Sequence, residues 1–178
     1  MRIHCTVALA FITVFAAPST VHAQDASPDL KAGFLIRYNY AAHRLIQLAE
    51  AIPEDKFAWS PGEGVMSVER VFMHIIRYNY YYPASSLGIA APAGIDVANL
   101  ESLTGKATVL DHLQASLDHV RDLVKPMSEA DLGRRVTLYG QETAAWNVLH
   151  QLQVHLGEHL GQLIAYARMN DVVPPWSQ

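Results

Sequence analysis

Along most of this chain, hydrophobic residues recur at intervals of three and four positions, which is the spacing of an amphipathic α-helix. The pattern predicts four long helices, over residues 28–51, 67–82, 106–125 and 142–170. Ser27 is the expected cap of the first helix, with Pro28 at its first position, and Ser67 is the expected cap of the second. A proline follows each of the first three helices, at Pro53, Pro83 and Pro126.

Two of the connections between these helices are long. Residues 84–105 are rich in small side chains and predict a crossover connection. The second long connection contains the stretch RRVTLYG, which fits either a short extended segment or a loop tethered at Gly133 and Gly140. Four long helices with two generous connections predict an all-α fold, a four-helix bundle.

The first 23 residues have the layout of a secretory signal peptide. Arg2 precedes an apolar run over residues 7–17, and Val21, His22 and Ala23 form a candidate cleavage triplet. The run is short for a bilayer span, although an uncleaved N-terminal anchor is the alternative. We therefore expect residues 24–178 to form one exported domain, periplasmic or secreted, with no stable membrane anchor after cleavage.

Composition then narrows the classes of function. Cleavage after residue 23 leaves 178 − 23 = 155 residues, and the one cysteine, Cys5, is removed with the signal peptide. A thiol nucleophile, a thiolate metal site and a disulfide are therefore not expected in the mature chain. Loss of Arg2 leaves a net charge of 12 − 17 = −5 and no basic run, so no nucleic acid partner is expected.

His155 and His159 are the first candidates for metal ligands. They stand at i and i+4, hence on one face of the fourth predicted helix, where two imidazoles can bind one divalent cation. His74 lies in the apolar run VERVFMHII and is the candidate third ligand, because a buried histidine needs a polar partner or a metal. Spacing alone leaves open that all three are ordinary bundle residues, which is how we interpret His43, His112, His119 and His150.

The stretch HLGEH also matches H-x-x-E-H, the motif of inverzincin proteases, in which the glutamate is the general base. That class needs a further acidic zinc ligand well downstream. Only 178 − 159 = 19 residues follow His159, and Asp171 is the one acidic residue among them. The inverzincin interpretation is therefore rejected.

Two stretches together resemble the DinB-like superfamily, also called the DinB/YfiT-like putative metalloenzymes. The last helix of that family carries H-x-x-x-H followed by x-G-Q, matched here by His155, His159, Gly161 and Gln162. Upstream, AIPEDKFAWSPGEGVMSVERVFMHII resembles the family's proline-containing loop and serine-started helix, whose histidine is matched by His74. The resemblance extends over roughly residues 30–176.

The resemblance implies a four-helix bundle with up-up-down-down topology, often as a homodimer. It also implies a divalent metal ion, zinc, nickel or iron, held by three histidines with water in the open position. Known activities of the wider family are mainly thiol-dependent transferases and isomerases. Because low-molecular-weight thiols are scarce and oxidised outside the cytoplasm, an exported chain is harder to reconcile with that chemistry.

Our leading hypothesis is therefore an exported, metal-dependent, hydrolase-like enzyme acting on an unidentified small molecule. Metal-activated water would attack an ester, amide or similar carbonyl, with Glu158 as the candidate catalytic base and a solvated helix residue as its alternative. Gln162 is expected to orient a ligand or to bond across helices, and Tyr78 to lie near the metal or in the core. Gly157 and Gly161 are expected to permit close helix approach.

Two other classes of function remain open. The first is a non-catalytic exported bundle that binds a metal or another ligand, and a site sealed by apolar side chains or holding a fourth protein ligand would favour it. The second is a protein without metal, whose three imidazoles would lie too far apart to share an ion.

Overall fold

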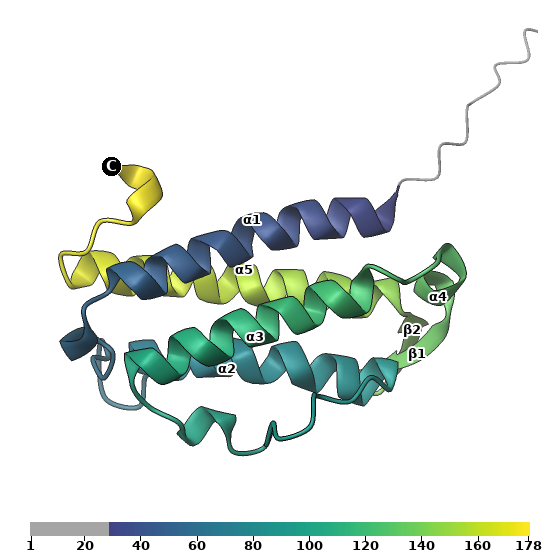
Figure 1. Ribbon diagram of the computed structural model, residues 1–178, viewed down its shortest axis with the longest axis horizontal. Helices are drawn as coiled ribbons and strands as arrows, with labels where there is room; N and C mark the ends of the chain where they lie inside the picture. The colour runs from purple at the N-terminus through teal and green to yellow at the C-terminus, as the bar shows by residue number, and fades with distance from the viewer. Residues whose placement is uncertain (1–28) are drawn as a thin grey trace, which may run out of the picture.

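The computed structural model describes residues 29–178, in which four long helices pack side by side (Figure 1). These helices are α1 (Leu30–Ala51), α2 (Val68–Tyr82), α3 (Lys106–Val124) and α5 (Trp146–Met169). The short elements between them are η1 (Glu54–Lys56), η2 (Pro83–Leu87), η3 (Leu100–Ser102), α4 (Glu129–Gly133), β1 (Arg135–Leu138) and β2 (Gln141–Ala144), and η4 (Pro175–Ser177) follows α5. The expected signal peptide, with Ser27 and Pro28, lies outside the described residues.

Short polar side chains cap the starts of α1 and α2. Asp29 caps α1 by accepting a hydrogen bond from the backbone N–H of Ala32 at 2.9 Å. Ser67 caps α2 as expected, by accepting from the backbone N–H of Arg70. The chain passes Pro83 without a break, however, through the wider turn η2, and turns away at Gly88, whose φ of 74° suits glycine.

A β-hairpin stands where the sequence pattern placed the start of the last helix. Strand β1 pairs antiparallel with β2 in register Arg135 to Ala144, which confirms the extended alternative for RRVTLYG. Tyr139 and Gly140 make the two-residue turn, both with positive φ, as hairpin turns of this length require. The fold is thus mainly helical rather than purely all-α, and α5 begins at Trp146 instead of residue 142.

The directions of the helices correct the expected topology. Lys31 Nζ donates to the carbonyl of Met127 at 3.0 Å, and Lys106 Nζ to that of Ile52 at 2.7 Å, so α1 and α3 are antiparallel. The backbone N–H of Gly105 donates to Glu69 at 2.9 Å, which places the starts of α2 and α3 together. The order is therefore up-down-down-up, with α5 parallel to α1 (Figure 1), and not up-up-down-down. The physical reason is the crossover at residues 88–105, which returns the chain along the whole of α2 before α3 begins.

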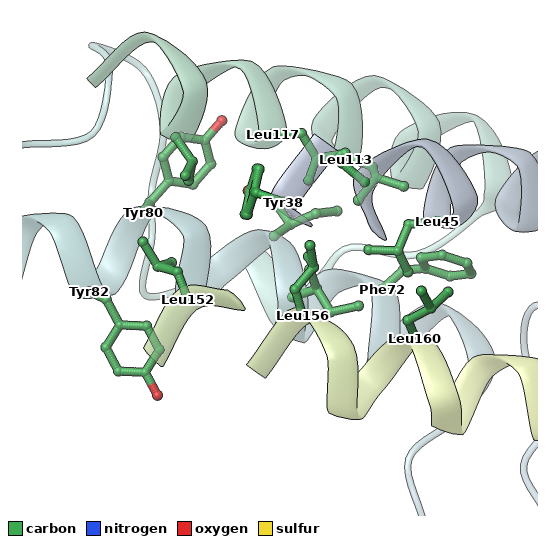
Figure 2. Packing of buried hydrophobic residues seen from close by; sticks show 14 of the residues in the cluster. Tyr38, Leu45, Phe72, Tyr80, Tyr82, Leu113, Leu117, Leu152, Leu156 and Leu160 are labelled. Atoms are coloured by element: carbon green, nitrogen blue, oxygen red, sulfur yellow. The ribbon is translucent and has the colours of Figure 1, made fainter. Parts of the chain in front are cut away.

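The core lies between the four helices and is almost entirely apolar. Figure 2 shows Leu45, Phe72, Leu117 and Leu156 meeting there, all fully buried. One polar chain crosses this core, from Tyr38 on α1 through Asn79 on α2 to Ser116 on α3. Among the described residues, no helix has the length and apolar character needed to cross a bilayer.

Candidate metal centre

His74, His155 and His159 come together on the side of the bundle where α2 lies against α5. One ring nitrogen from each residue lies within 4.8 Å of the corresponding nitrogens of the other two. The ring centroids of His155 and His159, one turn apart on α5, are 4.5 Å apart, and that of His74 is 5.1 and 4.9 Å from them. The three imidazoles therefore lie together, and the alternative in which they are too far apart to share an ion does not hold.

A carboxylate holds the outer edge of His74. Nδ1 of His74 lies 3.0 Å from Oε1 of Glu101, which comes from η3 in the crossover. Arg70 donates to the other oxygen of Glu101 through Nε at 3.0 Å and Nη2 at 2.9 Å, and Arg77 donates to Oε1 at 3.3 Å. Burial opposes ionisation of Glu101, but His74 and the two arginines outweigh it and lower the pKa of this carboxyl.

An amide holds the outer edge of His159 in the same way. Nδ1 of His159 lies 2.8 Å from Oε1 of Gln162, whose Nε2 donates to the hydroxyl of Tyr166 at 2.9 Å. The ring of Tyr166 in turn packs edge-on against Trp59, with the centroids 5.4 Å apart. Since a carbonyl oxygen can only accept, Nδ1 of His159 carries the hydrogen and Nε2 keeps its lone pair. Gln162 thus fixes the orientation of the His159 ring, through bonds along α5 rather than across helices.

His155 is the most buried of the three, with 7% of its surface exposed. Its Nε2 is buried and makes no hydrogen bond within residues 29–178, which is unusual for a buried polar atom. Burial, reinforced by His159 and His74, lowers the pKa of His155 to about 3. Burial likewise lowers the pKa of His74, against the opposing effect of Glu101. Both imidazoles are therefore neutral at pH 7, the form in which histidine binds metals.

These residues fit a divalent cation. Nitrogens bound at about 2.1 Å to one tetrahedral zinc ion lie about 3.4 Å apart, so the three nitrogens, now within 4.8 Å of one another, would close in by up to about 1.4 Å when they bind the ion. The lone pair of Nε2 is free on His74 and His159, since their Nδ1 atoms are engaged, and Nε2 of His155 lacks a partner. An ion at this point would satisfy all three atoms at once.

Comparison with known proteins agrees with this architecture. The model of the DinB superfamily matches residues 37–163, a span that includes all three histidines. The chain belongs to the DinB superfamily. A search of curated proteins finds no match.

Solved structures of other DinB-like proteins share the fold of this superfamily member. The crystal structure of a DinB-like protein from Bacillus cereus has a TM-score of 0.68 at 17% identity, covering 81% of this chain and 95% of its own. A DinB-like protein from Bacillus subtilis has a TM-score of 0.60 at 20% identity, covering 84% of this chain and 97% of its own. At these identities the likeness concerns the fold alone.

Aromatic and amide groups surround the histidines of this DinB-superfamily protein. The half-buried ring of Tyr78 lies 4.6 Å from that of His74 and 4.8 Å from that of His155, which supports the expectation that Tyr78 lies near the site. Beyond it, the hydroxyl of Tyr82 bonds to that of Tyr139 in the hairpin and accepts from Gln151 at 3.5 Å. The surroundings of the cluster are thus partly polar.

Other expected site residues lie elsewhere. Glu158 is exposed on α5 and does not belong to the histidine cluster. Gly157 and Gly161 are also exposed, and a methyl group at either position would meet no atom within 4 Å, so the expected close helix approach is wrong. His43 and His150 are exposed, as expected of ordinary bundle residues.

Glu101 is the residue that the sequence pattern did not indicate. It lies 27 positions from His74, in a crossover without helical periodicity, and only the fold brings the two together. The crossover contains two acidic residues, Asp96 and Glu101, and nothing in its sequence distinguishes which of them would reach His74.

Proposed function

We propose that this DinB-superfamily protein binds a divalent metal ion through His74, His155 and His159 and acts as a hydrolase-like enzyme on a small molecule. The observation that carries the proposal is the three imidazole nitrogens within 4.8 Å, two of them on rings whose other nitrogen is held by an acceptor. A cation held by neutral ligands keeps its full charge and acts as a Lewis acid toward water or a carbonyl. Zinc, nickel and iron all suit imidazole ligands.

Catalysis is favoured over a purely structural metal by the ligand set. Structural zinc sites are closed by four protein ligands, whereas catalytic sites keep a position open. Among the described residues the cluster has three members, and His74 and His159 are only partly buried. The non-catalytic metal- or ligand-binding bundle and a thiol-dependent transferase are the alternatives that the experiments below separate.

The chain's own groups would orient a substrate and move protons. Tyr78 covers one side of His74 and His155 with an aromatic ring, so a substrate would pack beside it. Glu158 remains our candidate for the general base, supported by its place next to His159 and not by a contact. We further propose that residues 1–23 direct export to the periplasm or the medium and that the mature chain is a homodimer.

Elemental analysis of protein purified without chelator or histidine tag tests the metal. We expect about one metal ion per chain in the wild type and its loss in the His155→Ala/His159→Ala variant. The matched control is His150→Ala, on the same helix but exposed and outside the cluster, which should keep its metal. A wild type without metal, or a double variant that retains it, would refute the site.

Turnover then separates the classes of function. The metal-loaded protein is screened against ester and amide substrates, with and without added glutathione. Hydrolysis without thiol that disappears in the double variant supports the proposal, and activity only with thiol supports the transferase. Glu158→Gln should lower turnover while leaving metal content unchanged. Full activity in Glu158→Gln would remove this residue from the mechanism.

A further inference from the structure

We propose that Glu101, on the crossover between α2 and α3, is a positioning residue that fixes the tautomer and orientation of His74 for metal binding. The inference rests on the proposed function and adds to it a residue outside the three ligands. Glu101 Oε1 lies 3.0 Å from His74 Nδ1, and 16% of its side chain is exposed, against 21% for His74. The contact is therefore shielded from water.

The chemistry of the pair decides which nitrogen of His74 is free. An ionised carboxylate only accepts hydrogen bonds, so Nδ1 of His74 must carry the hydrogen that it donates to Glu101. Nε2 then holds the lone pair and is the atom available to a cation. Carboxylate–histidine–metal arrangements of this kind orient the ring and raise its basicity.

Two arginines keep Glu101 in place and ionised. Arg70 engages Oε2 through two nitrogens, at 3.0 and 2.9 Å, and Arg77 reaches Oε1 at 3.3 Å. Both arginines lie on α2, one turn before and just under one turn after His74, so the carboxylate is held on three sides. Fixed donors of this kind remove the freedom that an isolated surface glutamate would have.

The imidazoles of His74 and His159 therefore differ in the group that accepts a hydrogen bond from Nδ1. His74 donates to a charged carboxylate, whereas His159 donates to the neutral amide oxygen of Gln162. Because a negative partner raises the basicity of an imidazole more than a neutral one, Glu101 should strengthen the binding of a cation by His74. Removal of Glu101 should thus weaken the site although no ligand is changed.

The test measures the affinity for Zn²⁺ by competition with a chromogenic chelator, on the full chain. We expect Glu101→Ala to weaken binding about 10- to 100-fold and Glu101→Gln, which keeps an acceptor oxygen, to weaken it less. Glu69→Ala is the matched control, because Glu69 also bonds the crossover, through the backbone N–H of Gly105, without touching a histidine. It should bind Zn²⁺ as the wild type does.

A second readout needs no metal. Nitrogen-15 NMR of the metal-free protein reports the tautomer of His74, and we expect Nδ1–H in the wild type and a mixture of tautomers in Glu101→Ala. Equal Zn²⁺ affinities in wild type, Glu101→Ala and Glu69→Ala would overturn the inference while leaving the metal site intact. Equal losses in Glu101→Ala and Glu69→Ala would mean that Glu101 only anchors the crossover, which also overturns it.

If the wild type binds no Zn²⁺, the proposed function fails, and the tautomer alone then decides the role of Glu101. Should Glu101→Ala fail to fold, Glu101→Met carries both measurements, because it preserves the size of the side chain without an acceptor oxygen. An unchanged tautomer together with unchanged Zn²⁺ affinity in Glu101→Met would then overturn the inference.

Discussion

The polar chain through the core permits a quantitative prediction of stability. The hydroxyl of Tyr38 donates to Asn79 Oδ1 at 3.2 Å, and the amide of Asn79 donates to Ser116 Oγ at 3.1 Å. Tyr38 and Ser116 are fully buried, and Asn79 is 2% exposed. Tyr38→Phe removes only the hydroxyl and leaves the ring, so the buried oxygen of Asn79 loses the one hydrogen bond it accepts within residues 29–178.

The cost follows from that loss. A buried acceptor left without its partner costs about 1–3 kcal/mol, more than the net value of about 0.5–1.5 kcal/mol for the hydrogen bond itself. For a domain of this size each kcal/mol lowers Tm by about 2–4 °C, so a loss of about 2 kcal/mol lowers Tm by about 4–8 °C. We expect Tyr38→Phe to reduce the free energy of unfolding, measured by urea titration, by about 2 kcal/mol.

Tyr80→Phe is the matched control for this experiment. Its ring is also buried, at 1% exposure, but its hydroxyl makes no hydrogen bond with the described residues and is not a buried unsatisfied atom. We expect the free energy of unfolding to change by less than about 0.5 kcal/mol. Equal stabilities of Tyr38→Phe, Tyr80→Phe and the wild type would refute the reasoning that Asn79 depends on Tyr38 for a buried hydrogen bond.

Two further predictions concern α5 and α3. Gly161→Ala should raise the free energy of unfolding by about 0.5–1 kcal/mol, because alanine suits a helix interior better than glycine and the new methyl group has open space. A urea titration measures the gain, and a loss instead would indicate that another chain covers this face. Burial lowers the pKa of His119, whose Nε2 has no hydrogen bond partner among the described residues, so the unfolded chain binds its proton first as pH falls below about 6.5. The wild type should therefore lose more stability than His119→Gln between pH 7.5 and pH 5, and identical pH profiles in urea would contradict this.

The long helices and the pairing of His155 with His159 could be predicted from the sequence because both depend on local spacing. Apolar periodicity and prolines indicated α2 and α3 to within a residue or two. The i, i+4 spacing placed His155 and His159 on one face, since helix geometry alone fixes that relation. His74 became a candidate through its apolar neighbours, and the order of motifs that the family shares then supported its place beside the pair.

The features that could not be predicted depend on contacts between segments far apart in the sequence. The helical pattern extended through Glu142 because β2 has polar and small residues that suit either structure, and its pairing with β1 decides the outcome. The parallel direction of α3 relative to α2 is set by where the crossover delivers the chain, which no local pattern encodes. Glu101 can be recognised as a partner of His74 only once the fold places that crossover against α2.

The parallel packing of the first and last long helices has a consequence for biosynthesis. Of the four long helices, α1 is synthesised first, yet α5, one of the helices it packs against, is synthesised last. Until then α1 exposes part of its apolar face, and only His74 of the cluster has been made. Completion of the hydrophobic core and assembly of the histidine cluster therefore occur together, after synthesis of the final helix.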